Sequence, residues 1–493
     1  MPTLSCAVDL GASGGRVMLG CYDGGKLALE ELHRFPNEPV GLGGTLYWDI
    51  LRLLHEIRQG LRRRTAGAAG IRSIGIDTWG VDFGLLGADG RLLENPVHYR
   101  DARTAGSIEA AGEIFPLPAF YRETGLQFMT GNTVFQLFAL ARQRPALLER
   151  AERLLFLPDL LGYFLTGERT TEESIARTSQ LLRVEDGAGP VWSERVFETL
   201  GLPRRLVGEI VPAGTPLGPL LPESQEETGL SPVPVISVCG HDTQSAVCAV
   251  PSGEAGSEFA FLSSGTWSLL GTELERPIAD DKAYKYNITN EGGLGKTRFL
   301  KNITGLWLIQ ESRRAWARAG ESYSYADLER LALDAPAFRR FLDPDDPAFG
   351  APGDIPARIR DVCRRGGQRP PETVGETVRC IYESLAMQYR RTLERLQDCT
   401  GKRYARLHVI GGGVKDTLLC QMTANACGIP VLAGPAEATV LGNLAVQLMA
   451  QGELTGLAEA RELIARSFPV REYLPRDEAA WQEGYGEFLR KVG

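Results

Sequence analysis

Two Ser/Gly-rich turns, each between two apolar stretches, are the parts of this chain best suited to binding an anion. The first turn lies within Val8–Gly20 and the second within Phe261–Gly271. A strand that enters a tight turn and a strand that leaves it expose backbone N–H groups to an anion. Two such hairpins in one chain predict two related domains that hold a polyphosphate between them. The aligned pairs are Ser13 with Ser264, Gly14 with Gly265, Leu19 with Leu270, and Gly20 with Gly271.

Two aspartates stand at the ends of predicted strands. Asp242 follows the apolar stretch Val233–Val238 and Gly240, so short rigid backbone would carry its carboxylate into a cleft. Asp9 ends the first predicted strand, directly before the first turn. Such carboxylates are ionised at neutral pH and can accept a proton or approach Mg²⁺. From the residues alone, structural roles stay open: Asp242 could cap a following helix and Asp9 could stabilise its own turn.

Length and charge limit the classes of protein to consider. A chain of 493 residues favours two domains, and the small polar stretch Pro251–Gly256 is the best boundary, giving domains 1–250 and 251–493. The net charge of −8 argues against a nucleic-acid or anionic-membrane partner. An anionic ligand must therefore be held locally, by loop amides, a metal ion or single arginines.

No segment of the sequence predicts export or membrane insertion. The N-terminus lacks a basic stretch followed by an apolar one, and no run approaches twenty apolar residues, so we expect a cytoplasmic protein. The nine cysteines contain no C-x-x-C pair and favour reduced thiols over a metal site. Proximity of Cys363 to Cys380, or of Cys420 to Cys427, stays open, and the sequence does not predict an oligomeric state.

Strand and helix patterns alternate along the chain, which predicts α/β architecture with largely buried sheets. A C-terminal tail from Phe468 to Gly493 is expected to pack on the body through its aromatic residues. The predicted helices are Asp49–Arg64, Thr373–Cys399 (ended by Gly401) and Lys415–Cys427, and the predicted strands include Ile71–Asp77, Val233–Val238 and Arg406–Ile410.

A set of motifs along nearly the whole chain carries a family resemblance. They are Ala7–Ser13 with Gly15-Arg16, Gly75–Phe83, His98–Asp101, Gly240–Thr243, Ser264–Trp267, Asn290–Gly293, Lys301–Ile303 with Gly305–Trp307, and Gly411–Gly413. In these motifs the chain resembles the FGGY carbohydrate kinase family, and within it the rhamnulokinase branch. The resemblance implies an α/β fold of two ribonuclease-H-like, actin-like ATPase domains around a central cleft. It also implies a mainly sugar-binding first domain and a mainly ATP-binding second domain with a helical tail.

The resemblance further implies a kinase that uses ATP and Mg²⁺ to phosphorylate the 1-hydroxyl of L-rhamnulose. By resemblance, Asp242 is the base that accepts the proton of the sugar hydroxyl, and Asp9 approaches Mg²⁺ through water. The implied sugar-side residues are Gly80, His241, Asp242, Thr243 and Asn302. The implied ATP-side residues are Ala12, Ser13, Gly14, Gly15, Arg16, Thr266, Gln310 and Gly412.

Three alternatives remain beside this interpretation. Another ketose or polyol, such as L-fuculose or xylulose, could be the substrate, because sugar choice depends on a few hydrogen bonds. A non-catalytic actin-like nucleotide-dependent module could use the same fold. The stretch Asn290–Thr297 resembles a P-loop, but it begins with Asn instead of Gly, and an apolar strand instead of a helix follows Lys296. We therefore do not expect a P-loop there.

Overall fold

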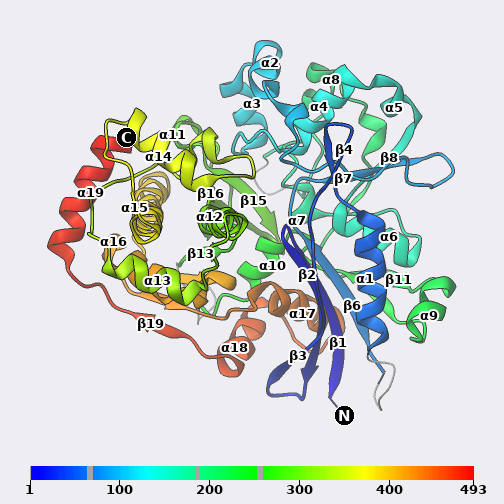
Figure 1. The fold of residues 1–493 in the computed structure, drawn as a ribbon. Helices are drawn as coiled ribbons and strands as arrows, with labels where there is room; N and C mark the ends of the chain where they lie inside the picture. The colour runs from blue at the N-terminus through cyan, green and yellow to red at the C-terminus, as the bar shows by residue number, and fades with distance from the viewer. Residues whose placement is uncertain (1, 64–69, 185–188, 253–258, 493) are drawn as a thin grey trace. The chain divides into compact units, whose positions relative to one another are not determined.

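The computed structural model describes residues 2–63, 70–184, 189–252 and 259–492, and internal contacts divide the chain into two compact units (Figure 1). Residues 253–256 of the predicted domain boundary lie outside the described residues. Unit 1 comprises Met1–Ala255, Glu273–Phe299 and Ala438–Phe468, and unit 2 comprises Gly256–Thr272, Leu300–Glu437 and Pro469–Gly493.

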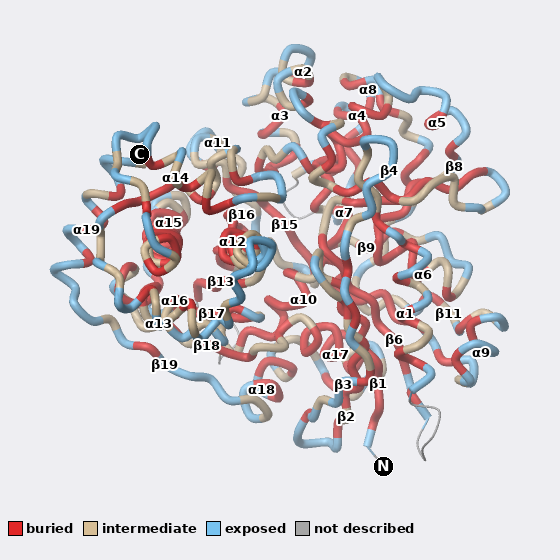
Figure 2. The backbone as a smooth tube through the Cα atoms, in the orientation of Figure 1, coloured by how far each residue is buried: buried red, intermediate tan, exposed pale blue. Residues whose placement is uncertain are grey.

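Unit 1 is built on a six-stranded sheet in the order β11-β12-β6-β1-β2-β3. β1 and β2 form an antiparallel hairpin, whereas β6 runs parallel to β1 and β12 runs parallel to β6. β1 and β6 are buried along almost their whole length, as the red tube shows (Figure 2), and the polar residues Ser73, Asp77 and Thr78 of β6 are buried with the apolar ones. The strands are β1 (Thr3–Gly11), β2 (Gly14–Tyr22), β3 (Leu27–Pro36), β6 (Ser73–Thr78), β11 (Thr215–Pro219) and β12 (Pro234–Ser237).

The helix predicted over Asp49–Arg64 is confirmed as α1 (Ile50–Arg62). Asp49 caps it, since its side chain accepts a hydrogen bond from the backbone N of Arg52 at 3.1 Å. The apolar stripe of α1 is buried in the core of this sheet.

Further elements of unit 1 are β4 (Val40–Leu42), β5 (Thr45–Tyr47), β7 (Phe83–Gly87), α2 (Ser107–Ile114), α3 (Leu117–Thr124), α4 (Thr133–Gln143), α5 (Pro145–Arg150), β8 (Ala151–Phe156), α6 (Leu157–Thr166), β9 (Thr171–Glu172), α7 (Glu173–Ala176), α8 (Glu194–Leu200), β10 (Ile210–Val211), α9 (Pro222–Thr228), α11 (Asp281–Tyr286), β15 (Thr289–Gly293) and α18 (Leu457–Ser467).

Two helices pack closely in unit 1 although they lie far apart in sequence. They are α10 (Asp242–Cys248) and α17 (Ala438–Ala450). A Cβ atom at Gly442 would stand 1.7 Å from the carbonyl oxygen of Ser245, so only glycine permits this approach. Gln447 of α17 also donates to the carbonyl oxygen of Cys6 in β1 at 3.0 Å. A late segment of the chain therefore completes the first unit.

The sheet of unit 2 repeats the strand directions of unit 1. β13 (Ala260–Ser264) and β14 (Trp267–Leu274) form an antiparallel hairpin, β17 (Leu407–Ile410) runs parallel to β13, β18 (Val431–Ala433) runs parallel to β17, and β19 (Arg471–Tyr473) closes the series antiparallel. Unit 1 has the same sequence of pairings from β2 to β11. The predicted α/β fold with two related halves is thus confirmed.

The two hairpins turn at different points of the aligned sequences. Gly11 pairs with Gly14, so Ser13 lies in the first turn. Ser264 instead ends β13 and pairs with Ser268, so the second turn comes after it. The match of Ser13 with Ser264 is therefore a sequence likeness and not a structural equivalence.

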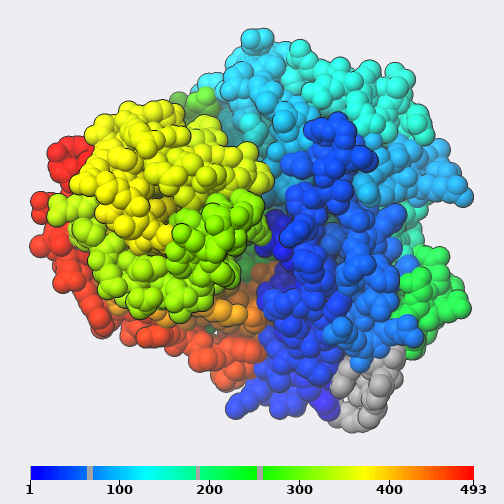
Figure 3. Space-filling view, in the orientation of Figure 1, coloured from blue at the N-terminus to red at the C-terminus, as the bar shows by residue number. Residues whose placement is uncertain are grey.

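The other helices predicted for the second half are also confirmed. α15 (Val374–Thr400) is capped by Thr373 and ends at Gly401, which has a left-handed φ of 69°, and α16 (Thr417–Cys427) follows β17. The C-terminal tail belongs to unit 2, and Figure 3 shows it in red at the surface of that unit. Its residues Tyr473, Trp481 and Tyr485 are buried. Further elements are β16 (Lys296–Thr304), α12 (Trp307–Arg318), α13 (Tyr325–Asp334), α14 (Ile355–Arg365) and α19 (Glu478–Val492).

The nine cysteines are reduced, and Cys363 lies beside Cys380. Within the described part of the chain, every helix is too short or too polar to cross a lipid bilayer.

Candidate active site

Three aspartates meet at one edge of the unit 1 sheet. Asp9 of β1 pairs with Asp77 of the parallel strand β6, and Thr78 bridges to His241, which directly precedes Asp242. The backbone N of Thr78 donates to the carbonyl oxygen of Gly240 at 2.8 Å. Because the carboxyl ends of parallel strands share one edge of a sheet, the three carboxylates converge there. The charge of Asp9 accordingly contributes to raised pKa values of Asp77 and Asp242.

Asp242 is the first residue of α10, and its carboxylate remains within reach of a ligand. The N-cap position belongs to His241, and the Asp242 side chain is 28% exposed. Thr243 Oγ1 donates to Asp242 Oδ1 at 3.2 Å. Desolvation by the surrounding protein, opposed by the charge of His241 and assisted by that of Asp9, raises the pKa of Asp242 to about 6. Above that pH the carboxylate is ionised and able to accept a proton.

Two buried side chains that the sequence analysis missed hold the backbone in front of Asp242. Glu172 Oε2 accepts hydrogen bonds from the backbone N of Gly240 at 2.9 Å and from Ser174 Oγ at 2.6 Å. Ser174 Oγ in turn accepts from the backbone N of His241 at 3.2 Å. Burial raises the pKa of Glu172 to about 7. These contacts fix the direction in which His241 and Asp242 project, and no motif in the sequence marks them.

Asp9 and Arg16, predicted to face the metal and the phosphates, form an ion pair. They are cross-strand partners in the β1–β2 hairpin. Arg16 Nε and Nη2 both donate to Asp9 Oδ2, at 2.9 and 2.7 Å. The pair lies beside the turn of Ala12 and Ser13, where the predicted phosphate-binding loop begins. Each side chain is thus already oriented by the other at this edge of the sheet.

The acidic edge fits a divalent cation held mostly by water and ligand oxygens. Burial, assisted by the charge of Asp9, raises the pKa values of Asp77 and Asp242, and a cation at this edge would offset part of the charge of Asp9. Over the described ranges, no group of three or more His, Cys, Asp or Glu side chains forms a complete metal cage. A hard divalent cation such as Mg²⁺ keeps several waters and takes few protein oxygens, so a complete protein cage is not needed for one to bind at this edge.

Asn443 is a further residue that the sequence analysis missed. Its Nδ2 donates to Asp77 Oδ2 at 2.6 Å, and Asp77 is completely buried. Burial and the charge of Asp9 raise the pKa of Asp77 well above its ordinary value, although this hydrogen bond opposes the shift. Asn443 and Gln447 are one helical turn apart on the otherwise apolar α17. Two amides on an apolar helix were the signal that could have identified them.

Gly80 lies in a turn next to a rigid buried carboxylate. A Cβ atom at Gly80 would stand 3.1 Å from the Thr178 side chain, so the turn packs closely there. Asp82 accepts hydrogen bonds from Trp48 Nε1 at 2.6 Å, from Trp79 Nε1 at 2.9 Å and from Gln136 Nε2 at 2.9 Å. Burial raises the pKa of Asp82 to about 6. The backbone N of Tyr99 also donates to Asp82, at 3.3 Å, so four donors on one carboxylate hold this turn.

Unit 2 brings two of the predicted ATP-side residues together on its hairpin. Thr266 lies in the β13–β14 turn, and its Oγ1 donates to Oε1 of Gln310 on α12 at 3.2 Å. The backbone N of Trp307 also donates to the carbonyl oxygen of Thr266 at 3.1 Å. Asn302, predicted to face the sugar, lies on the unit 2 part of β16, whereas Gly80, His241, Asp242 and Thr243 belong to unit 1.

A glycine run follows β17 and contacts the same hairpin. Gly411 has φ 85° and lies close to the Ser264 carbonyl oxygen, 3.1 Å from where its Cβ would stand. A Cβ at Gly413 would stand 2.0 Å from Ser264 Oγ, whereas a Cβ at Gly412 would meet nothing within 4 Å. The flanking glycines pack against the hairpin and leave the predicted nucleotide residue Gly412 open.

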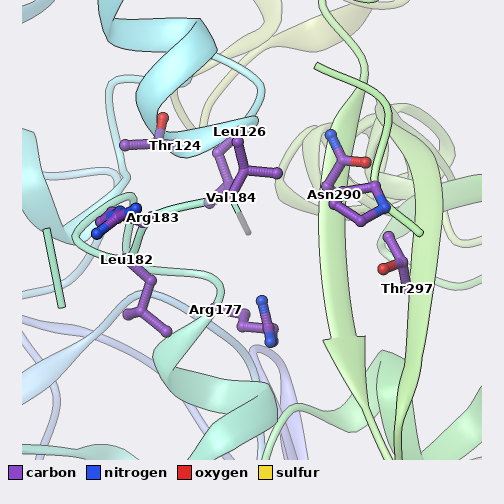
Figure 4. Close-up of a pocket in the computed structure, with 9 residues that line it drawn as sticks. Thr124, Leu126, Arg177, Leu182, Arg183, Val184, Asn290 and Thr297 are labelled. Carbon is purple, nitrogen blue, oxygen red and sulfur yellow. The ribbon is translucent and has the colours of Figure 1, made fainter. Parts of the chain in front are cut away.

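The P-loop-like stretch Asn290–Thr297 is a β-hairpin. β15 ends at Gly293 and β16 begins at Lys296, with Leu294 and Gly295 in left-handed conformations between them. Asn290 and Thr297 line a pocket of unit 1 together with Arg177 (Figure 4). Within the described residues, none of the predicted site residues lines this pocket.

Comparison with known proteins agrees with this fold. Residues 4–249 match the N-terminal domain, and residues 260–451 the C-terminal domain, of the FGGY family of carbohydrate kinases. The chain belongs to this family.

The relatives narrow the resemblance further. The chain is 46% identical over 487 residues to a rhamnulokinase of Bacteroides thetaiotaomicron, covering 99% of each chain. It is 41% identical to a rhamnulokinase of Enterococcus faecalis, covering 95% of this chain and 93% of the relative. Among solved structures, a xylulose kinase from Lactobacillus acidophilus has the same fold, with a TM-score of 0.79, 17% identity, and coverage of 99% of this chain and 97% of that one.

Proposed function

We propose that this protein is an ATP-dependent kinase that transfers the γ-phosphate to the 1-hydroxyl of L-rhamnulose. The observation that carries the proposal is the partly exposed Asp242 carboxylate, fixed at the acidic edge of the unit 1 sheet. The likeness to relatives named rhamnulokinases over nearly the full chain supports the choice of sugar.

In the proposed reaction Asp242 is the catalytic base. It accepts the proton of the sugar hydroxyl while the oxygen forms its bond to the γ-phosphorus. The bond from that phosphorus to the bridging oxygen breaks, and ADP leaves. Phosphoryl transfer needs little covalent chemistry from the protein, so positioning and charge neutralisation provide most of the rate. A base of this kind contributes about 10²–10⁴-fold.

The remaining predicted residues receive roles on either side of this step. Gly80, His241, Thr243 and Asn302 bind the sugar, and Asp9 orients water around Mg²⁺. A bound Mg²⁺ would neutralise phosphate charge. The proposed ATP-side residues are the first turn with its arginine (Ala12, Ser13, Gly14, Gly15 and Arg16) together with Thr266, Gln310 and Gly412. We further propose that residues 1–250 serve mainly the sugar and residues 251–493 mainly ATP.

A coupled ADP-release assay with a panel of ketoses and polyols tests the proposal. We expect kcat/KM to be highest for L-rhamnulose, and well above the values for L-fuculose and xylulose. A higher kcat/KM for another sugar would identify that sugar, instead of L-rhamnulose, as the preferred substrate. Tight ATP binding without sugar-dependent ADP release would instead favour the non-catalytic actin-like module.

A further inference from the structure

Glu291 is a buried carboxylate that the proposed reaction leaves without a role. It lies on β15, with a side chain that is 5% exposed, and its Oε2 is 3.2 Å from Nδ1 of His241. The other ring nitrogen of His241, Nε2, is 3.5 Å from Oδ1 of Asp242. Gln244 Nε2 donates to the same Glu291 oxygen at 3.0 Å. The imidazole therefore stands between a buried carboxylate and the carboxylate assigned as the base.

We propose that Glu291 is a positioning residue that holds His241 by Nδ1, so that Nε2–H faces Asp242 and the imidazolium charge keeps Asp242 ionised. The inference rests on the proposed kinase function, because it gives Glu291 a task in that reaction. Glu291 touches neither reacting group in this arrangement and acts only through His241.

Hydrogen-bonding chemistry supports this orientation of the ring. A carboxylate only accepts hydrogen bonds, so the nitrogen facing Glu291 carries a proton. When the ring is charged, both nitrogens donate, and Nε2 then presents its proton to Asp242. The backbone of His241 is already fixed by Ser174 at 3.2 Å, so the ring orientation depends mainly on its side-chain partners.

The charged groups around the pair give the arrangement its electrostatic consequence. Burial disfavours the charged ring, but Glu291 on β15, Asp242 on α10 and Glu172 on β9 together raise the pKa of His241 above its ordinary value. The imidazolium in turn opposes the rise in the pKa of Asp242 that is caused by burial and by Asp9. Asp77 on β6 also lies close enough for its charge to interact with Asp242, and Arg16 on β2 pairs with Asp9. Loss of the Glu291 charge would thus leave Asp242 protonated to higher pH.

The first test follows the titration of His241 by NMR in the protein without substrate. The chain has five histidines, and His241→Asn identifies the signal. We expect His241 to titrate above 6.5 in the wild type and at least about one unit lower in Glu291→Gln, since one unit corresponds to the loss of about 1.4 kcal/mol of charge interaction. Glu291→Asp keeps the charge and should restore part of the difference.

A matched control removes a neighbouring carboxylate that does not contact His241. Glu173 on α7 pairs with Arg177 at 2.9 Å, and α7 packs against β15. Glu173→Gln should leave the His241 titration unchanged. Equal titration of His241 in wild type and Glu291→Gln would overturn the proposal.

The second test is the pH profile of kcat/KM, measured with ATP and sugar below saturation so that it reports the groups of the free enzyme. Because Asp242 must be ionised, the wild-type profile should fall on the acid side near pH 6. Glu291→Gln should shift this limb upward by about one unit, giving roughly fivefold lower kcat/KM at pH 6, approaching tenfold below about pH 5, and a nearly wild-type value at pH 9. In a His241→Asn background, Glu291→Gln should cause no further shift.

The two tests separate failure of the inference from failure of the proposed function. An unmoved acid limb in a folded Glu291→Gln variant would overturn the positioning role, and so would a further shift in the His241→Asn background. A wild-type protein that phosphorylates no sugar would refute the proposed function, while the NMR titration would still decide whether Glu291 controls His241. Thermal melting of each variant shows whether it is folded.

Discussion

The two sheets have the same succession of strand directions but carry different residues at equivalent positions. In unit 1, Asp9 lies two residues before the hairpin-closing Gly11 and pairs with Asp77 on the parallel strand. In unit 2 the hairpin closes at Ser264, so Leu262 occupies the equivalent position, and its partner on the parallel strand is Val409. At this strand position unit 1 therefore has two carboxylates and unit 2 has two buried apolar side chains.

This difference indicates how a duplicated fold can divide one reaction. An edge with clustered carboxylates suits a proton acceptor and a metal ion. The unit 2 hairpin, with glycines packed against it and open space at Gly412, suits an anionic nucleotide, and the nearby carboxylate of Asp416 is occupied by Tyr382 and by the cap of α16. The proposed division of the two halves between sugar and ATP therefore agrees with the residues at each edge more than with the backbone, which the two halves share.

The largest effect is expected from removing the base in unit 1. Asp242→Asn should lower kcat by about 10²–10⁴-fold with little change in the melting temperature, because it deletes the proton acceptor and keeps the shape. Asp416 of unit 2 is a matched control, since burial raises its pKa to about 6 as well and its side chain caps α16. Asp416→Asn should keep kcat within about threefold, because Asn also caps helices well. Equal kcat in wild type and Asp242→Asn, measured by ADP release, would contradict the assignment of Asp242 as the catalytic base.

The second effect concerns the packing of the unit 2 glycines. Gly413→Ala would place a methyl group 2.5 Å from Ser264 Cβ, and we expect it to destabilise the protein by about 1–3 kcal/mol. Gly412→Ala meets open space and should change stability by less than about 0.5 kcal/mol. Thermal or urea unfolding measures both variants. Equal stabilities would show that the hairpin contact does not constrain this turn.

The contrast between the halves was only partly accessible from the sequence. The hairpins, the buried strands and α15 were predicted because local apolar patterns and a C-terminal glycine determine them. The support of Asp77 by Asn443 was not, since it joins residues 366 positions apart. The roles of Glu172 and Glu291 were missed for the same reason: each depends on a long-range contact to the segment around His241.

A moderate effect is expected from two threonine hydroxyls, one in each unit. Thr266→Val removes the hydroxyl that donates to Gln310 and that we propose to face the ATP phosphates. A hydrogen bond to a charged group such as a phosphate contributes about 1.5–3 kcal/mol, so the KM for ATP should rise about tenfold. The KM for the sugar should change little. Thr243→Val removes the hydroxyl that donates to Asp242, and it should lower kcat without changing the KM for ATP. Initial-rate kinetics in both substrates distinguishes the patterns. The reverse assignment of the two effects would contradict the division between the units.

The smallest effect is expected from Lys296, the residue that would be essential if Asn290–Thr297 were a P-loop. In the structure it begins β16, and it forms an ion pair with Glu275, whose side chain is largely exposed. Exposed pairs of this kind contribute about 0–1 kcal/mol, so Lys296→Ala should lower the free energy of unfolding by no more than about 1 kcal/mol. The KM for ATP should stay within about twofold of the wild-type value. The same substitution at a P-loop lysine would abolish nucleotide binding, because that side chain reaches the β- and γ-phosphates. Isothermal titration with ATP compares the two cases directly. Loss of binding in a folded Lys296→Ala variant would move the nucleotide site to the β15–β16 hairpin and remove the division of labour drawn from the two edges.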